Sequence, residues 1–316
     1  MTDAHPPSGS PLSALGSGGV ESRTTASAGG PTITESGLWS DAWRQLRRNP
    51  LFLVPALLII VLTVMAVRPS LFTTGDQDPR RCSLSNSLEL PSPGHPFGHD
   101  LQGCDYYART VYGAKVSMSV GVLTTAFAAL IAMIFGSLAG YYGKFIDTLI
   151  ARITDIWFAI PTILGAIVIL NVLNRRGILT VSLVLILLSW PTMLRLMRSS
   201  VLSTKEMDYV SAARALGAGD LRIMRRHILP NAIAPVIVYA TILIGISISA
   251  EAALSFLDVG LQLPAISWGL MINNAQSRIL DYPHLLLFPS AFLSVAIFSF
   301  ILMGDALRDA LDPKLR

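Results

Sequence analysis

Six long apolar segments constrain this chain more strongly than any other feature of its sequence. None of them contains Asp, Glu, Lys or Arg, and they cover residues 51–67, 116–140, 156–174, 178–194, 232–250 and 285–304. As helices rising about 1.5 Å per residue, such segments suit a bilayer core about 30 Å thick. Lipid offers the backbone no hydrogen-bond partners, and the segments are too long and too uniformly apolar for barrel strands. The sequence therefore predicts an all-α, polytopic membrane protein with six transmembrane helices.

The composition excludes the common soluble classes. Of the 316 residues, 52% are hydrophobic and only 14% are charged, whereas soluble domains carry about 25% charged residues. Two cysteines are too few for a disulfide scaffold. The net charge of +4 is compatible with nucleic-acid binding, but in membrane proteins basic residues mainly reflect topology. We therefore expect membrane lipid, and no nucleic acid, among the partners.

The distribution of basic residues predicts the orientation of the chain. With the N-terminus inside, the expected cytoplasmic segments hold 16 of the 24 Lys and Arg residues. Cytoplasmic loops of membrane proteins are enriched in these residues. Because the number of spans is even, both termini are expected in the cytoplasm.

The chain divides into three parts. Of the first 38 residues, 27 are Gly, Ser, Thr, Pro or Ala, so 1–38 is expected to be a disordered cytoplasmic tail. It lacks the apolar core of a signal peptide. Residues 39–115 are expected to hold the first transmembrane helix and an extracytoplasmic loop. Residues 116–316 are expected to form the main transmembrane domain, with a long cytoplasmic loop at 195–231.

Motifs for covalent chemistry are missing from the sequence. Gly143-Lys144 is followed by Phe145, so no phosphate-binding loop is present. The five histidines show no metal-ligand spacing. Asp155 and Glu251, the ionisable groups nearest the span interiors, lie at span ends, which disfavours ion-coupled transport. We expect no catalytic residue, no metal site and no cofactor in this chain.

The loop at 195–231 carries the most information about function. Residues 203–206 (Ser-Thr-Lys-Glu) have the spacing of a capping box and predict a helix start. Tyr209, Ala213 and Gly217 follow at i, i+4 and i+8, with Ala212 and Leu216 flanking them. This small, smooth face favours close docking of a partner protein. The alternative, a helix lying on the membrane, would carry bulkier apolar residues.

The same loop also contains helix-ending signals. Gly217 and Gly219 are expected to break the docking helix. A second short, basic helix is expected at 220–228, leading to Pro230.

Residues 209–217 (YVSAARALG), followed by 226–231 (RHILPN), closely resemble the EAA motif of binding-protein-dependent ABC transporter permeases. Further stretches resemble the C-type permease subunit of the dipeptide/oligopeptide branch of that family. These are 95–100 (HPFGHD) with 112–114 (YGA), 251–257 (EAALSFL) with 267–269 (SWG), and 304–313 (GDALRDALDP). The similarity runs from about residue 40 to residue 316.

This resemblance implies a permease subunit of an ATP-driven importer of di- or oligopeptides in the cytoplasmic membrane, working by alternating access. The implied partners are a homologous B-type permease subunit, two cytoplasmic ABC ATPase domains that bind ATP and Mg, and an extracytoplasmic substrate-binding protein. Contacts with the ATPase are expected from Tyr209, Ala212, Ala213, Leu216, Gly217, Ala218, Arg226 and Pro230. Nickel or a nickel chelate is an alternative cargo within the family. A secondary transporter or channel, and a non-transporting structural or receptor-like subunit, are the alternatives from other classes.

Three positions depart from the family pattern. Ser211 stands where the motif has Glu, His99 stands where Thr is usual, and Cys104 replaces Arg in the usual Gly-Arg-Asp. Cys82 is the other cysteine of the chain and falls in the same expected outer loop, 68–115. On an oxidising side of the membrane the two can form a disulfide, with two unpaired thiols as the alternative.

The sequence gives little indication of which residues line the cargo path, since apolar spans carry little substrate information. Asn171, Asn174 and Glu251 are the polar residues nominated near such a path.

Overall fold

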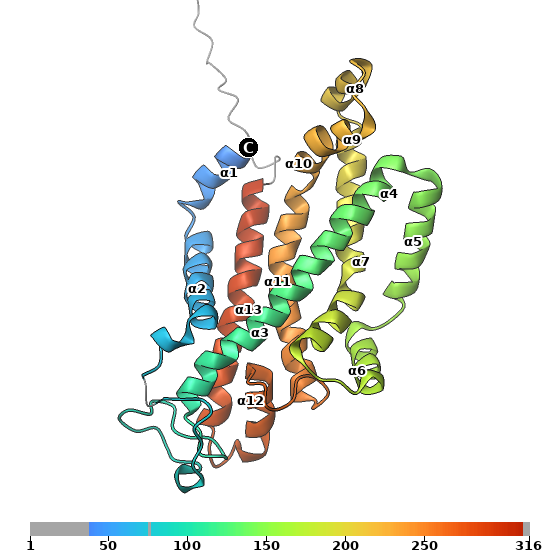
Figure 1. The fold of residues 1–316 in the computed structure, drawn as a ribbon. Coiled ribbons are helices and arrows are strands. Elements are labelled where there is room, and N and C mark those ends of the chain that lie inside the picture. The colour runs from blue at the N-terminus through green and yellow to red at the C-terminus, as the bar shows by residue number, and fades with distance from the viewer. Residues whose placement is uncertain (1–37, 75–76, 312–316) are drawn as a thin grey trace, which may run out of the picture. The chain divides into compact units, whose positions relative to one another are not determined.

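The computed structural model describes residues 38–74 and 77–311, and helices dominate this part of the chain (Figure 1). Of the expected tail, only Leu38 is described, and it begins the first helix; the rest of 1–38 lies outside the described residues. The described ranges hold no β-strand, and β-pairing there is confined to isolated bridges. The prediction of an all-α membrane fold is confirmed.

The helices follow one another with short connections after residue 105. They are α1 (Leu38–Leu46), α2 (Pro50–Val67), α3 (Tyr106–Ile131), α4 (Ser137–Tyr142), α5 (Lys144–Phe158), α6 (Thr162–Leu173), α7 (Ile178–Lys205), α8 (Asp208–Ala215), α9 (Asp220–Ile223), α10 (Leu229–Ala232), α11 (Ala234–Phe256), α12 (Trp268–Ala275) and α13 (His284–Leu311). Single π-helical turns join α3 to α4 at Ala132–Gly136 and α9 to α10 at Met224–Ile228. Short 3₁₀ turns occur at Pro69–Leu71, Leu84–Asn86 and Gln276–Arg278.

Five continuous helical segments in the described part are long and apolar enough to span a membrane. They are Pro50–Val67, Tyr106–Tyr142, Ile178–Lys205, Ala234–Phe256 and His284–Leu311. A sixth crossing exists only if α5 and α6 are counted as one broken span, because the two helices are bent by 84°.

The expected single helix at 156–174 is therefore wrong in detail. Its sequence is divided between the end of α5 and the whole of α6, with the bend at residues 159–161. Pro161 causes the break, because it has no amide hydrogen and disfavours helical geometry at Ile160. The chain restarts as α6 with Pro161 at its N-cap, and Gly165 N donates to Pro161 O at 2.8 Å.

The second span is longer than hydropathy predicts. Asp105 caps α3 by accepting a 2.7 Å hydrogen bond from Ala108 N, so the helix starts ten residues before the expected boundary at 116. Polar residues such as Arg109 and Lys115 occupy these first turns. Because they lower the local hydropathy, the apolar run begins later in the sequence than the helix does. The expected outer loop 68–115 ends at residue 105.

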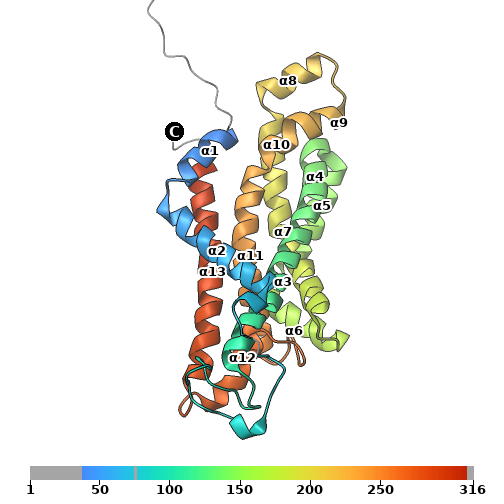
Figure 2. The same cartoon turned by 60° about the vertical axis from the view of Figure 1, so that its left-hand side comes forward.

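Four long helices form the centre of the bundle. Helix α3 packs against α7 and α11, α11 packs against α13, and α2 lies across α3 and α13 (Figure 2). Close approach depends on glycines. A Cβ at Gly140 would lie 2.8 Å from Val201 Cβ on α7, and one at Gly121 would lie 2.7 Å from Ile248 Cγ1 on α11. Small residues at helix crossings are how membrane helices gain packing energy.

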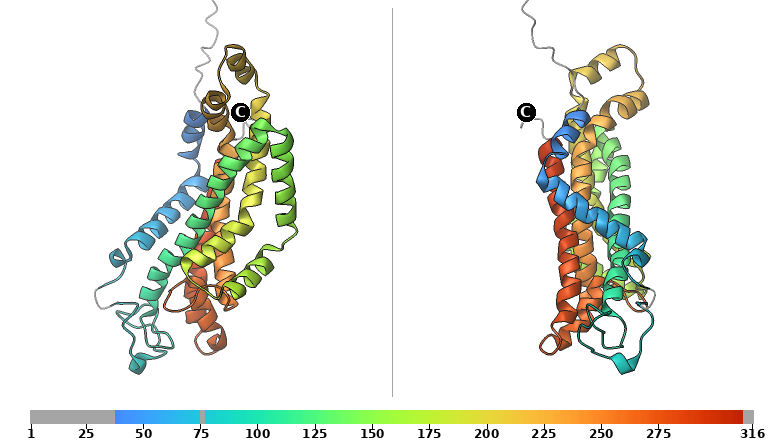
Figure 3. Two further views of the ribbon diagram at one scale, coloured as in Figure 1. Left: turned by 45° about the vertical axis from the view of Figure 1, so that its right-hand side comes forward. Right: turned by 90° about the vertical axis from the view of Figure 1, so that its left-hand side faces the viewer.

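The two ends of the bundle differ in character. Helices α1, α8, α9 and α10 lie at one end together with the last turns of α13 (Figures 1 and 3). The irregular loop at 77–105 and helix α12 lie at the other end. Large apolar side chains of α2, such as Leu51 and Leu57, are exposed on the outside of the bundle, as expected for a surface in lipid.

Candidate functional site

Helix α8 projects from the end of the bundle, as Figures 1 and 3 show. Helix α7 continues to Lys205, so residues 203–206 end one helix instead of starting the next, and the predicted capping box is wrong. The hydroxyl of Thr204 instead donates a 2.8 Å hydrogen bond to Ser200 O within α7. Helix α8 begins at Asp208, after Met207 in extended conformation.

The predicted glycine stop occurs at Gly217. This residue has φ +81°, the left-handed region that glycine adopts without strain. Ala218 N donates to Ala213 O at 3.1 Å and Gly217 N donates to Arg214 O at 3.0 Å, which closes the end of α8. The chain then turns into α9, and the helical stretch from Asp220 through the π-helical turn contains the predicted basic helix 220–228.

Helix α8 is held to the bundle by one apolar side chain. Val210 is fully buried in a core cluster that includes Val201 of α7, Ile223 of α9 and Ile228. Ala218 packs against the same cluster. The side of α8 that carries Val210 is therefore not available to a partner.

Most of the expected contact residues lie on the surface. Tyr209, Ala212, Leu216, Gly217, Arg226 and Pro230 are exposed, whereas Ala213 and Ala218 are half-buried. Leu216 is 89% exposed. Ala213 is three residues after Val210 and shares its inward side, which turns the Tyr209–Ala213–Gly217 stripe partly toward the bundle. The open face instead combines Tyr209, Ala212 and Leu216, and we call it the α8 face.

Tyr209 contributes a neutral phenol to this surface. Its side chain is 43% exposed, and partial burial raises the pKa of Tyr209 above its ordinary value. Leu221 of α9, which is 67% exposed, adds another apolar side chain near the same tip of the molecule.

Polar contacts fix the α8–α9 unit to the neighbouring helices. Tyr141 Oη of α4 donates to Asp220 Oδ1 of α9 at 2.6 Å, and Lys205 Nζ donates to Tyr141 O at 2.7 Å. Ser200 Oγ of α7 donates to Ala232 O at 2.8 Å. Of these bonds, the one to Asp220 ties the α8–α9 unit to α4, and the other two join α7 to α4 and to α10.

Helix α5 is joined to α7 by ion pairs near the same end of the bundle. Arg195 Nη2 lies 2.6 Å from Asp155 Oδ1, and Arg198 forms a bidentate contact with Asp147. The Arg195 guanidinium also lies 3.9 Å from the centroid of the Phe158 ring. These contacts connect the broken span to the helix that leads directly into α8.

Glu251 does not line an open path in this conformation. It is completely buried, and its carboxyl group accepts hydrogen bonds from Ser117 Oγ of α3 at 3.0 Å and from Ser255 Oγ at 2.8 Å. Ser117 Oγ also accepts a bond from Trp268 N at 3.3 Å. Glu251 thus joins α3, α11 and α12, a role that its sequence position did not indicate.

Asn171 and Asn174 are placed differently from Glu251. Both are exposed at the end of α6, and Asn174 ends that helix with φ +47°. Asn171 Oδ1 accepts a 3.3 Å bond from Arg176, whose guanidinium also contacts Asp258 O at 2.5 Å. The three nominated path residues therefore do not form one site.

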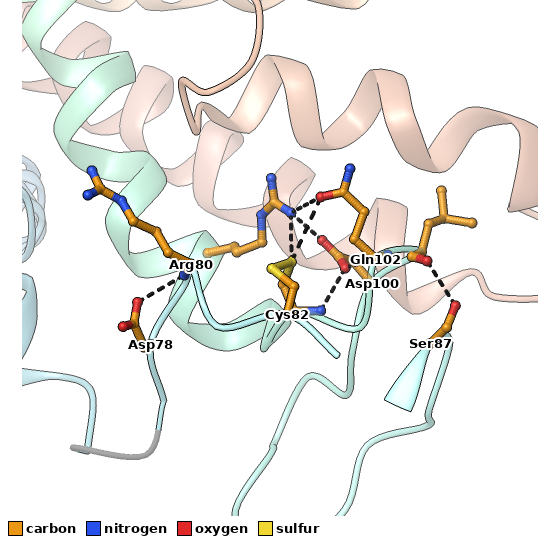
Figure 4. The surroundings of a disulfide bond; sticks show 9 residues. Asp78, Arg80, Cys82, Ser87, Asp100 and Gln102 are labelled. Carbon is orange, nitrogen blue, oxygen red and sulfur yellow. Dashed lines mark hydrogen bonds and ion pairs between the residues drawn. A yellow bond between two sulfur atoms is a disulfide. The ribbon is translucent and has the colours of Figure 1, made fainter. Parts of the chain in front are cut away.

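The outer loop is closed by a disulfide between Cys82 and Cys104, with their Cα atoms 4.1 Å apart. Asp100 and Gln102 lie beside it (Figure 4). Asp100 Oδ2 forms a buried 2.5 Å ion pair with Arg109 Nη1, and Asp100 Oδ1 accepts a 2.9 Å bond from Cys104 N. The sequence did not predict the Asp100–Arg109 ion pair. Arg109 was expected to lie in the outer loop, and no sequence spacing indicates which loop residues come into contact.

The same loop gathers groups that the sequence separates. His95 Nδ1 lies 2.5 Å from Asp105 Oδ2, and the His95 and His99 ring centroids are 4.4 Å apart. Each of the three residues offers a potential ligand atom within 4.8 Å of the others. The expectation of no metal site was based on the spacing of histidines along the sequence. Folding of the loop brings together residues whose spacing along the sequence does not match a known metal-ligand motif.

Comparison with known proteins identifies the family. Residues 132–316 match the family described as binding-protein-dependent transport system inner membrane component. Residues 37–86 match the N-terminal TM domain of oligopeptide transport permease C.

Curated relatives match along nearly their whole length. The chain is 37% identical to the oligopeptide transport system permease protein OppC of Bacillus subtilis over 279 residues, which is 88% of this chain and 90% of that protein. It is 39% identical to the B. subtilis dipeptide transport system permease protein DppC, covering 87% of this chain and 86% of that protein. It is 38% identical to the glutathione transport system permease protein GsiD of Escherichia coli O157:H7, covering 88% and 91%.

Solved structures agree on the fold. A chain of the MetNI methionine ABC transporter, in inward-facing conformations, superposes with a TM-score of 0.52 at 19% identity, covering 65% of this chain and 96% of that chain. The matched family covers more than half of the sequence, and the relatives match at well above 30% identity. The chain therefore belongs to the family of binding-protein-dependent transport system inner membrane components, as a multi-pass permease subunit of the inner membrane.

Proposed function

We propose that this chain is the C-type permease subunit of an ABC importer that carries di- or oligopeptides. Its support comes from the relatives, which are named for oligopeptide, dipeptide and glutathione transport and match at 37–39% identity. Glutathione is itself a tripeptide, so the three names share one chemical class. No relative named above concerns nickel, so the nickel alternative is not favoured.

The observation that carries the coupling role is the α8 face. A helix anchored by Val210 but exposing Tyr209, Ala212 and Leu216 offers a compact apolar surface in solvent. Such a surface is typical of a contact site for a partner protein. We assign it to the cleft of a cytoplasmic ATPase domain, because the sequence itself has no phosphate-binding loop. ATP and Mg would be bound by two such partner domains.

The proposed topology follows from this assignment. The end that carries α1, α8–α10 and the last turns of α13 would face the cytoplasm, in line with the positive-inside rule. The disulfide-closed loop at the other end would face outward, where disulfides persist. There it would receive an extracytoplasmic substrate-binding protein.

Transport would proceed by rigid-body gating. Closure of the ATPase dimer would move α8, and the packing of Val210 against α7 and the bond from Asp220 of α9 to Tyr141 of α4 would transmit the displacement to the spans. The ion pairs from α7 to Asp147 and Asp155 would make α5 follow. A homologous B-type permease would complete the pathway, and two arrangements of the spans would alternate.

ATPase activity of the complex tests the proposal. The complex is reconstituted in proteoliposomes with its substrate-binding protein and titrated with di-, tri- and longer peptides, glutathione, and Ni²⁺ with or without histidine. Stimulation by peptides of one size range supports the proposal and defines the cargo. Stimulation by nickel alone would reject peptide import, and peptide uptake without ATP would point to a secondary transporter.

A further inference from the structure

We propose that the outer loop contains a resident binding site for a divalent transition metal, best suited to Zn²⁺, formed by His95, His99 and Asp105 with Glu89 as the fourth ligand. This inference is independent of the cargo. It concerns the permease chain alone, so it can fail while the proposed function stands.

The ligand atoms of His95, His99 and Asp105 already lie close together, and Glu89 Oε2 lies 3.3 Å from His99 Nδ1. His95 Nδ1 is 2.5 Å from Asp105 Oδ2, and the rings of His95 and His99 are 4.4 Å apart between centroids. One potential ligand atom from each of the three residues lies within 4.8 Å of the others. Four ligands around a tetrahedral zinc stand roughly 3.3 Å apart at bond lengths near 2.0 Å. Small rotations of the half-exposed His95 side chain would open its contact with Asp105 and make room for the cation.

His99 supplies a second, independent indication. The residue is 4% exposed, and its Nδ1 is buried without a hydrogen-bond partner. Glu89 Oε2 is 3.3 Å away, but the two groups lack hydrogen-bond alignment. Buried polar nitrogens are nearly always satisfied. A cation between the imidazole and the carboxylate would satisfy both groups.

Asp105 is oriented as a metal ligand needs to be. Its Oδ1 accepts the capping bond from Ala108 N at 2.7 Å, which leaves Oδ2 turned toward His95. A hydrogen bond to the second oxygen fixes the carboxylate and is a common support for metal ligands. The helix cap and the metal site would share one side chain.

The backbone brings the ligands together across the loop. His99 N donates to Glu89 O at 3.0 Å, and Tyr106 N donates to Gly98 O at 3.0 Å. The Cys82–Cys104 disulfide closes a segment that contains Glu89, His95 and His99 and ends one residue before Asp105. A site closed in this way loses little entropy when a cation binds.

The donor set indicates the metal. Two imidazoles with carboxylates suit Zn²⁺ and other borderline cations, whereas Ca²⁺ and Mg²⁺ prefer oxygen ligands alone. His99 stands where the family pattern usually has Thr, so this ligand of the site belongs to this chain and not to the pattern. Without a metal, the same residues would form only a hydrogen-bonded turn.

Metal titration distinguishes a metal site from a loop that is held by hydrogen bonds alone. The full-length chain, purified with its partner subunits through a tag free of histidine, is stripped with a chelator and titrated with Zn²⁺ against a chromogenic competitor. We expect one equivalent per chain. His99→Thr and Glu89→Gln should each weaken binding by at least about tenfold. His284→Gln removes a histidine near the same end of the bundle but outside the cluster, and it should leave binding unchanged.

A Co²⁺ replacement provides a readout that does not depend on activity. The wild-type protein should show the intense visible bands of tetrahedral Co²⁺, and His99→Thr should lose them while keeping its thermal unfolding temperature in the metal-free form. Less than a tenth of an equivalent of Zn²⁺ in the wild type would overturn the proposal. Equal Zn²⁺ affinity in wild type and His99→Thr would overturn it as well.

Discussion

The phenol of Tyr141 on α4 donates a 2.6 Å hydrogen bond to Asp220 at the start of α9. The backbone oxygen of the same tyrosine accepts a 2.7 Å bond from Lys205 at the end of α7. One residue thus joins a long span to both ends of the segment that carries α8. In the proposed mechanism, this junction transmits movement of α8 to the membrane helices.

Tyr141→Phe removes the hydroxyl and leaves the ring. Loss of one hydrogen bond to a charged group should cost about 1.5–3 kcal/mol at most, less here because Asp220 is exposed. We expect transport to fall several-fold while ATPase subunits still co-purify. Tyr142→Phe, at the neighbouring exposed position, is the control and should retain transport. Equal transport by the two variants would show that the junction does not transmit movement.

Leu216→Asp places a charge on the α8 face. Because Leu216 is 89% exposed, the chain should insert and fold normally, but desolvating a carboxylate against an apolar partner surface is unfavourable. ATPase co-purification should fall at least about tenfold. Ser203→Asp adds the same charge at an exposed position near the end of α7 and should leave co-purification intact. Full recovery of ATPase with Leu216→Asp would exclude the α8 face as the main contact.

Gly140→Ala tests the contact between α4 and α7. The new Cβ would lie 2.8 Å from Val201 Cβ, closer than packed carbons tolerate, and overpacking of this kind costs about 1–3 kcal/mol. We expect a lower unfolding temperature in detergent. Gly177→Ala is a matched control, since no atom lies within 4 Å of its added Cβ. An unchanged unfolding temperature for Gly140→Ala would contradict the close contact.

Glu251 is predicted to act through packing and hydrogen bonding. Glu251→Gln preserves the size and one acceptor oxygen, and its amide NH₂ can donate to the hydroxyl oxygen of the other serine, so transport should remain within a few-fold of wild type. Glu251→Ala leaves both serines without their partner and opens a cavity, which should cost about 2–5 kcal/mol and lower the amount of folded protein. A complete loss of transport in well-folded Glu251→Gln would instead indicate a direct part in the transport cycle.

The disulfide should stabilise the outer loop. The double variant Cys82→Ser, Cys104→Ser should lose on the order of 3 kcal/mol, the value expected for a closed loop of this size. Peptide mapping under non-reducing conditions should recover the cross-linked peptide from protein kept free of reductant. Recovery of both thiols in the free state would contradict the bond, and the double variant should then unfold like the wild type.

Local sequence was enough to identify several features of this protein. Apolar runs without charge require membrane helices, because the backbone must satisfy its own hydrogen bonds in lipid. Gly217 marks the end of α8, since glycine accepts the positive φ found there. The family motifs at 209–217 and 226–231 indicate a permease from the sequence alone. Even the break at Pro161 is a local effect that hydropathy alone overlooked.

Other features depend on which side chains meet across the fold. Burial of Val210 by α7 and α9 decided that Ala213 turns inward and Leu216 outward. Packing of α3, α11 and α12 enclosed Glu251, and folding of the outer loop placed His95, His99 and Asp105 together. Helix starts, stops and spans follow from interactions between near neighbours along the chain. Burial and ligand geometry are set by contacts between distant residues, and those contacts exist only once the chain has folded.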